Sequence, residues 1–189
     1  MRNSIFIFLV CIGFISCNNT GTETKVVSFQ KDLFLMKNGV LNYNNIPFTG
    51  TLFFHDEVNK TNNFTTYEKG LKHGVEFKKY KNNVLAEQRF YTKGKKSGVH
   101  KSWWSENQLR FEYHFNDVGE YNGKVNEWFK NGQQLKAFNY IKGKEEGSQK
   151  MWNIDGKIRA NFVTVNGERF GLIGLKKCYT VNTINEDFK

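Results

Sequence analysis

The sequence has little of several residue types that define common protein classes: one proline, three methionines and three cysteines among 189 residues. A chain so poor in proline is not a proline-rich linker or a low-complexity protein. It also lacks a Gly-Lys-Ser/Thr phosphate loop, a nucleophile elbow and a His-Glu-x-x-His stretch. These motifs are typical of nucleotide hydrolysis, acyl transfer and zinc hydrolysis. Their absence favours a protein that is not an enzyme.

The cysteines do not predict a disulfide framework. Cys11 lies in an N-terminal apolar stretch, Cys17 follows that stretch, and Cys178 stands alone near the other end. If residues 1–16 are removed and Cys17 is modified, no intramolecular pair remains. Cys178 is interpreted as a small buried hydrophobe, with a thiol activated by two neighbouring lysines as the alternative.

The histidines and acidic residues form no recognisable catalytic or metal-binding set. None of the four histidines pairs with another at metal-ligand spacing; they are His55, His73, His100 and His114. His73 occupies a repeated position that holds serine, asparagine, glutamate or phenylalanine elsewhere, and we expect such a variable position to be solvated. The acidic stretches at residues 55–57 and 144–146 are interpreted as loop charges. No metal, cofactor or catalytic residue is therefore expected.

Aromatic residues, in contrast, are abundant. The chain has 18 phenylalanines, eight tyrosines and four tryptophans, and 39% of its residues are hydrophobic. This content is sufficient for a buried core. Large rings suit the pleated, half-buried surface of a sheet, so an all-β fold is predicted.

The N-terminus resembles the signal of a bacterial lipoprotein. Arg2 precedes an uncharged apolar run over residues 5–15; as a helix these residues span about 16 Å, too short for a bilayer core of about 30 Å. A signal helix is therefore predicted rather than a membrane span. Ser16 precedes Cys17, the expected site of acylation, although Phe14 stands where leucine is usual.

These features predict four segments. Residues 1–16 are a signal peptide, residues 17–27 comprise the lipidated cysteine and a polar tether, residues 28–175 form a repeat array, and residues 176–189 form a cap strand and tail. The expected location is the cell envelope. We expect the acylated chain to be anchored to a membrane, namely the outer membrane.

The repeat array is indicated by two sets of regularly spaced glycines, here called the first and second ladders. Gly50, Gly74, Gly98, Gly123, Gly147 and Gly171 are separated by 24, 24, 25, 24 and 24 residues. A second set precedes the later members by four residues each time: Gly70, Gly94, Gly119, Gly143 and Gly167. A fixed period of this length is typical of a repeat architecture.

A second turn signal lies between successive glycine pairs. The stretches are KNNV (residues 81–84), SENQ (105–108), KNGQ (130–133) and IDGK (154–157). Asn-Gly and Asp-Gly favour two-residue hairpin turns, and the paired glycines are assigned to a wider turn. Each period therefore holds two strands, and the irregular DEVNKTNN of the first unit predicts a longer hairpin there.

Strand periodicity supports this division. Leu109, Phe111, Tyr113 and Phe115 alternate with polar residues and are predicted to share one face. Ile158, Ala160 and Phe162 are predicted to do the same. In LKAFNY (residues 135–140) the alternation slips by one residue, which predicts a β-bulge.

An aromatic residue recurs just before each of the Asn/Asp turns. These residues are Tyr80, Trp104, Phe129 and Trp152. We interpret the row as rings that pack along the sheet; a stacking platform for sugars or bases is the alternative.

The combined pattern, with its Asn/Asp-Gly turn, its Y-x-K-G stretch and its second glycine, resembles the bacterial variant of the MORN repeat, often labelled YwqK-type antitoxin. The resemblance extends over about residues 33–171, and IPFTGTLFF (residues 46–54) is similar to the start of such arrays. It implies an elongated antiparallel β-hairpin meander whose units contact only their neighbours. It also implies protein or lipid contacts rather than chemistry.

The formal net charge is +10, or +9 without Arg2. An exported basic chain meets phospholipid, lipopolysaccharide and acidic glycans rather than nucleic acid. The candidate anion contacts are lysines of the glycine-paired turns: Lys69, Lys72, Lys93, Lys95, Lys96, Lys142 and Lys144. A solvated surface that binds nothing in particular is the alternative.

The leading functional hypothesis is a non-catalytic envelope lipoprotein that binds or scaffolds a protein partner. Direct binding of anionic lipid or glycan, and immunity toward a toxin, are the alternatives. The open edges of a meander favour pairing with a neighbour, but no sequence signal specifies an oligomeric state.

Overall fold

The computed structural model describes residues 25–174, and this part of the chain is all-β, with no helix. The predictions for the signal helix, Cys17, Cys178 and the C-terminal cap lie outside the described residues. The strands are β1 (Val26–Ser28), β2 (Phe34–Lys37), β3 (Val40–Tyr43), β4 (Ile46–Pro47), β5 (Gly50–Asp56), β6 (Thr61–Glu68), β7 (Leu71–Tyr80), β8 (Leu85–Thr92), β9 (Lys95–Ser105), β10 (Gln108–Phe115), β11 (Tyr121–Trp128), β12 (Gln134–Ile141), β13 (Lys144–Glu145), β14 (Gly147–Trp152), β15 (Ile158–Val165) and β16 (Glu168–Leu172).

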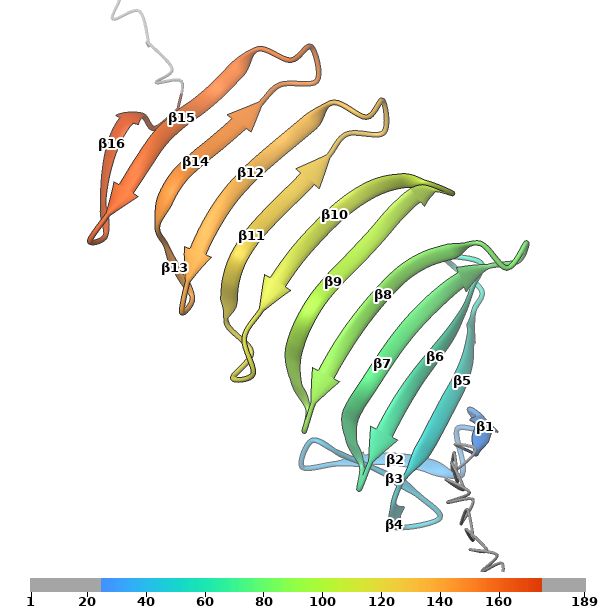
Figure 1. Ribbon diagram of the computed structural model, residues 1–189. Coiled ribbons are helices and arrows are strands. Elements are labelled where there is room, and N and C mark those ends of the chain that lie inside the picture. The colour runs from blue at the N-terminus through green and yellow to red at the C-terminus, as the bar shows by residue number, and fades with distance from the viewer. Residues whose placement is uncertain (1–24, 175–189) are drawn as a thin grey trace, which may run out of the picture.

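Most strands belong to one long sheet, which confirms the predicted meander (Figure 1). From β5 to β16 each strand pairs with the next in antiparallel order, except that β13 is a short partner of β12 and β14 continues the path. At the N-terminal end β1 adds to β5 in parallel, with Val26 opposite Thr51. The sheet is elongated because each hairpin extends it in one direction only.

The turns on one edge of the sheet, here called the Lys-Gly edge, are tight. Both central residues have positive φ in Lys69-Gly70 (50° and 78°), Lys93-Gly94 (49° and 82°) and Lys142-Gly143 (48° and 78°). This is the signature of a two-residue type I′ hairpin. The prediction of a wider turn at the glycine pairs is therefore wrong for these three turns.

The turns on the opposite edge, here called the Asn edge, are wider than predicted. In the turn between β7 and β8, the Tyr80 N–H donates to the Val84 carbonyl and the Asn83 N–H donates to the Tyr80 carbonyl, both at 2.9 Å. Only the last loop residue has positive φ; these residues are Asn83, Asn107, Gly132 and Gly156. The geometry is that of a three-residue loop closed by a bulge, so the expected two-residue turn is wrong here.

The single 25-residue step in the glycine ladder has a local cause. The turn between β10 and β11 is a three-residue loop, in which the Gly119 N–H donates to the Asn116 carbonyl at 3.1 Å and the Asn116 N–H donates to the Glu120 carbonyl at 3.0 Å. One residue has been inserted into a Lys-Gly turn, and the strands on either side keep their pairing.

The second glycine of each pair lies within a strand, not in the turn. Gly74, Gly98 and Gly123 have φ values of 82°, 63° and 109°, and the strand pairing shifts next to them. A bulge of this kind bends its strand. The strands are therefore curved (Figure 1).

Several glycines of this ladder lie opposite an aromatic residue. Gly50, Gly74 and Gly123 pair across the ladder with Tyr67, Tyr91 and Tyr140. The first ladder of glycines, which contains Gly74, Gly98 and Gly123, thus marks the bulges that bend the strands.

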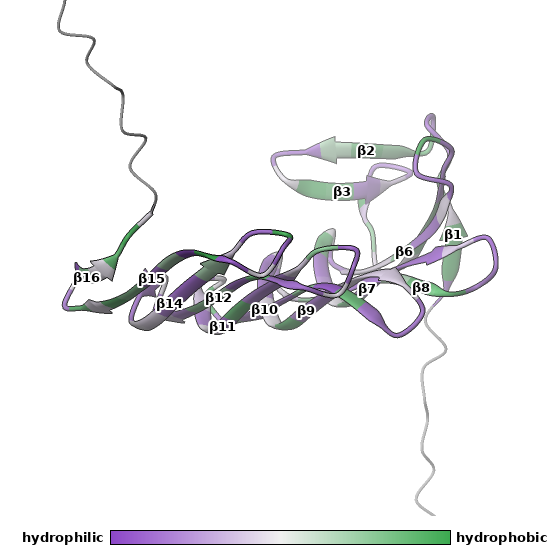
Figure 2. Cartoon of the chain, turned by 90° about the horizontal axis from the view of Figure 1, so that it is seen from above, coloured by the Kyte–Doolittle hydropathy of each residue, from purple (hydrophilic) through white to green (hydrophobic). Residues whose placement is uncertain are grey.

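A second, three-stranded sheet of β2, β3 and β4 covers one face of the long sheet near its N-terminal end (Figure 2). Phe34, Leu41 and Phe48 of this segment form a buried core with Tyr67 of β6. The segment is held to the first Lys-Gly turn, because the Leu41 N–H donates to the Gly70 carbonyl at 2.8 Å and the Gly70 N–H donates to the Phe48 carbonyl at 2.7 Å.

Neighbouring Lys-Gly turns are hydrogen-bonded to each other through the residue that precedes each glycine of the first ladder. From the sequence, this position is expected to be solvated. Thr49, His73 and Asn122 accept hydrogen bonds from the backbone N–H groups of Lys69, Lys93 and Lys142, at 2.9, 3.4 and 3.1 Å. The position tolerates different residues because threonine, histidine and asparagine all supply an acceptor. The His73 side chain is 41% exposed, as expected for a solvated position, and it also accepts this hydrogen bond.

The second core cluster lies far along the sheet and has no covering layer among the described residues. It comprises Val125, Phe138, Ala160 and Phe162. The predicted bulge in β12 is confirmed by a register shift beside Trp128 and Gln134. Ile158, expected inside, is exposed because a register shift separates it from Ala160.

Candidate binding surface

The two faces of the long sheet differ in burial. On one face, which also carries the small sheet, Val125 is 2% exposed and Gln149 is fully buried. On the other face of the same strands, Lys124 and Lys150 are exposed. Side chains crowd together on the inside of a bend and separate on its outside, so we name these the concave and convex faces.

The part of the concave face nearest the Lys-Gly edge carries a row of aromatic and charged side chains, here called the outer row. Cross-strand pairs place Lys72 beside Tyr67, Lys96 beside Tyr91 and Tyr121 beside Phe115. The members of the row are Tyr67, Lys72, Tyr91, Lys96, Phe115, Tyr121, Tyr140, Glu145 and Arg169.

Cations lie on rings along this row. The Lys72 ammonium is 4.8 Å from the centroid of the Tyr91 ring, and the Lys96 ammonium is 5.2 Å from that of Phe115. The rings continue from Phe115 to Tyr121 at 4.7 Å and from Tyr121 to Tyr140 at 5.2 Å. The row therefore alternates positive charge with π surface.

Polar side chains lie deeper in the concave face, where they satisfy backbone groups at the bulges. His100 is 2% exposed, and its Nε2 lies 2.8 Å from the Phe90 carbonyl oxygen. A carbonyl oxygen only accepts, so the ring carries its proton on Nε2. Burial lowers the pKa of His100 despite this hydrogen bond, so the ring is neutral near pH 7.

Gln149 also satisfies backbone groups at a bulge, in a later unit. Its Nε2 donates to the carbonyls of Asn139 and Glu146 at 2.9 and 3.2 Å, and its Oε1 accepts from the Asn139 N–H at 3.1 Å. The side-chain amide thus stands in for a peptide group where the ladder between β12 and β14 is interrupted. Sequence reasoning gave no role to either His100 or Gln149.

The carboxylates of the concave face are compensated by neighbouring cations. Glu76 lies 2.6 Å from the Lys72 ammonium, and Glu87 contacts both Lys78, at 3.2 Å, and Arg89. Both carboxylates are therefore charge-paired.

The tyrosines of the face are hydrogen-bond donors rather than acids. Burial, and after it the charge of Glu127, raises the pKa of Tyr113 far above its usual range, and the Tyr113 hydroxyl donates to Glu127 at 3.0 Å. Burial also raises the pKa of Tyr121 and Tyr140. Their hydroxyls therefore remain protonated at all physiological pH values.

The predicted lysines share the Lys-Gly edge but do not form one patch. Lys69, Lys93 and Lys142 occupy turn tips and are exposed. Lys72 and Lys96 lie on the concave face. Lys95 and Lys144 are exposed and pair across from Thr92 and Ile141, which places them on the convex side.

The predicted aromatic row lies along the Asn edge, and its members are half-buried: Tyr80, Trp104, Phe129 and Trp152. The Trp104 indole N–H donates to the Trp128 carbonyl at 3.0 Å, and the Arg110 guanidinium carbon is 4.7 Å from the centroid of the indole ring. A hollow of about 280 Å³ lies beside them, lined also by Tyr113 and Glu127.

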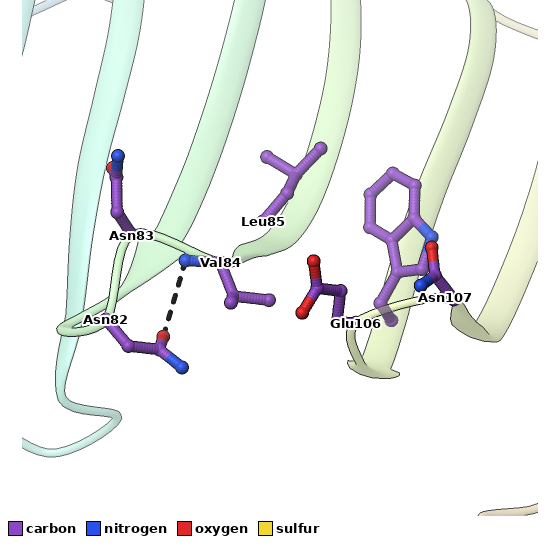
Figure 3. Close-up of a pocket in the computed structure, with 7 residues that line it drawn as sticks. Asn82, Asn83, Val84, Leu85, Glu106 and Asn107 are labelled. Atoms are coloured by element: carbon purple, nitrogen blue, oxygen red, sulfur yellow. Dashed lines mark hydrogen bonds between the residues drawn. The ribbon is translucent and has the colours of Figure 1, made fainter.

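A larger hollow of about 480 Å³ lies between two turns of the Asn edge (Figure 3). Asn82, Asn83, Glu106 and Asn107 surround it, and the Val84 N–H donates to the Asn82 side chain at 3.3 Å. The polar groups are those of the turns themselves, and a single carboxylate is the only charge among the lining residues. We assign it no ligand.

Two further searches of residues 25–174 bear on function. This part of the chain holds no helix that is both long and apolar enough to cross a bilayer. It also brings no three potential metal ligands of the His, Cys, Asp and Glu types into one group.

No protein-family model matches the chain, and no curated protein is significantly similar to it.

Proposed function

We propose that this protein is a non-catalytic lipoprotein of the cell envelope that holds a protein partner on the concave face of its repeat sheet. The observation that carries the proposal is the outer row, in which cations and aromatic rings alternate over several strands. Aromatic side chains are enriched in the buried centres of protein interfaces.

The surroundings of this row support a binding role. Glu76 and Glu87 are neutralised by neighbouring cations, and the tyrosines are donors. The resemblance to MORN repeats implies contacts with proteins or lipids, and the N-terminal sequence implies export and acylation at Cys17. An exported scaffold needs a surface and an anchor, and the chain offers a candidate for each.

The second candidate function is binding of anionic lipid headgroups. It is favoured by the lysines at the turn tips, since Lys69, Lys93 and Lys142 are exposed along one edge. Each lysine held near an anionic surface contributes about 1 kcal/mol. Such binding would use the edge of the sheet and leave the concave face free.

Site-specific photocrosslinking separates these functions. A photoreactive phenylalanine analogue would replace Tyr121 on the concave face or, as the matched control, Val163, which is 45% exposed on the convex face. In intact cells we expect position 121 to give a discrete protein adduct and position 163 to give none. Adducts from both positions alike, or from neither while the chain stays membrane-bound, would contradict the proposal.

A further inference from the structure

The repeat of the outer row has the same length as the repeat of a polyproline II helix. One unit contains two strands, so equivalent outer-row residues are about 9.4–9.8 Å apart. A polyproline II helix advances about 9.3 Å in one turn of three residues. Every third residue of such a segment would therefore meet the same position in successive units.

The chemistry of the row also fits this type of segment. A polyproline II backbone makes no internal hydrogen bonds and is recognised by aromatic-lined surfaces. Tyr121 and Tyr140 are half-buried rings in contact with each other at 5.2 Å. Their protonated hydroxyls can donate to the exposed carbonyls of the ligand, while their rings contact proline.

The charges of the outer row indicate where acidic residues of the bound segment would lie. Lys72 and Lys96 are equivalent positions one unit apart, and both point onto the concave face. The Lys72 ammonium also lies 2.6 Å from Glu76, so an acidic residue of the ligand would share this cation with Glu76. Lys96 is exposed and lies against a ring, without an ion pair among the described residues. Two units later the equivalent position is Glu145, which pairs with Arg169 at 2.9 Å. Acidic side chains are thus favoured at one end of the row only.

We infer that the partner is bound through a proline-rich segment in the polyproline II conformation, with acidic residues three positions apart that face Lys72 and Lys96. Prolines after them lie against the half-buried rings of Tyr121 and Tyr140. This inference rests on the proposed function and adds the chemistry of the partner to it.

Fluorescence anisotropy with labelled twelve-residue peptides tests the inference on the full-length chain in detergent. The first peptide has glutamates at its third and sixth residues and prolines at the others. A second has the same composition with its two glutamates adjacent, which a three-fold helix directs to different sides. A third replaces each Pro-Pro by Gly-Ser and keeps the glutamate spacing. We expect the first peptide to bind about tenfold more tightly than either of the others.

Variants of the chain supply the second readout. Lys96→Glu and Tyr121→Ala should each weaken binding of the first peptide about tenfold, whereas Lys124→Glu on the convex face should change it less than about twofold. Circular dichroism melts of the variants check that each one is folded. Equal affinity for the first two peptides, or equal effects of Lys96→Glu and Lys124→Glu, would reduce the interaction to general electrostatics and overturn the inference.

The outcomes distinguish this inference from the proposed function. If no peptide binds while position 121 still gives its adduct in cells, the partner is held on the concave face by another kind of segment, and the inference is wrong. If position 121 gives no adduct, the proposed function itself fails.

Discussion

Replacement of Gly70 by alanine is expected to destabilise the fold by about 3–5 kcal/mol, since a left-handed backbone strains alanine and the new methyl group overpacks its surroundings. Gly70 has a φ of +78°, and an added Cβ would lie 2.7 Å from the Leu41 carbonyl oxygen. The small sheet is hydrogen-bonded to both backbone groups of Gly70 and has little freedom to retreat. Urea unfolding followed by tryptophan fluorescence measures the change.

Gly143→Ala is the matched control. Gly143 has the same φ of +78° in the same kind of turn, but an added Cβ would lie 3.5 Å from its nearest neighbour, Glu120. Only the backbone strain remains, so a loss of about 1–2 kcal/mol is expected. Equal losses for the two variants would show that the small sheet does not pack on the Gly70 turn.

Replacement of Gln149 by leucine is expected to lower the free energy of unfolding by about 3–5 kcal/mol, since each buried polar group left without a partner costs about 1–3 kcal/mol. Leucine is similar in size, so packing is largely kept. The Asn139 N–H and the carbonyls of Asn139 and Glu146 lose the partners that Gln149 supplies. The same urea unfolding experiment reports the difference.

His100→Gln is the informative companion to this change. His100 and Gln149 occupy equivalent positions, and each donates to a backbone carbonyl ten residues earlier. Glutamine at position 100 can keep a donor for the Phe90 carbonyl, so a loss below about 1 kcal/mol is expected. A mild effect of Gln149→Leu would mean that the interrupted ladder between β12 and β14 finds other partners.

The overall architecture was readable from the sequence because its strongest signals are local and repeated. The two glycine ladders, the alternation in β10 and the slip in β12 each follow from the backbone preferences of a few neighbouring residues. All three lead to the antiparallel meander that the structure shows. The irregular first hairpin is also confirmed, since residues 57–60 form a four-residue connection between β5 and β6.

The turn types were predicted in the wrong places because glycine signals positive φ without specifying how many residues share it. Asn-Gly favours a type I′ turn, yet Asn131-Gly132 uses positive φ only at the glycine. Lys-Gly is a weaker signal, yet both residues of Lys93-Gly94 have positive φ. Hydrogen bonds between successive turns, such as that from Lys93 to His73, help to hold the lysines in this conformation.

The concave face could not be assembled from the sequence, because it depends on curvature. The bulges at Gly74 and Gly98 bend the strands and bring Tyr91, His100 and Phe115 together, with ring centroids 5.6 and 4.5 Å apart. The sequence marked Lys72 and Lys96 only as members of lysine-rich turns. Their position in the repeat, five residues after an outer-row tyrosine, was the signal that separates them from the lysines at the turn tips.

The small sheet was missed for a different reason. The stretch from Lys37 to Tyr43 looks like a half-unit of the array, and its Asn38-Gly39 turn is of type I′ as in the repeats, with φ values of 49° and 77°. The segment nevertheless leaves the plane of the long sheet and buries Phe34 and Leu41 against Tyr67. Burial of these side chains against a distant strand is a tertiary effect that local patterns do not report.

Lysine footprinting of the full-length chain tests the central claim, which is that the concave face is occupied by a partner in the cell envelope. Acetylation rates of Lys96 on the concave face and of Lys124 on the convex face would be compared between intact envelopes and the purified chain in detergent. We expect Lys96 to be acetylated at least about fivefold more slowly in the envelope and Lys124 to react equally in both. Equal rates for Lys96 in the two preparations, or protection of Lys124 instead, would contradict this claim.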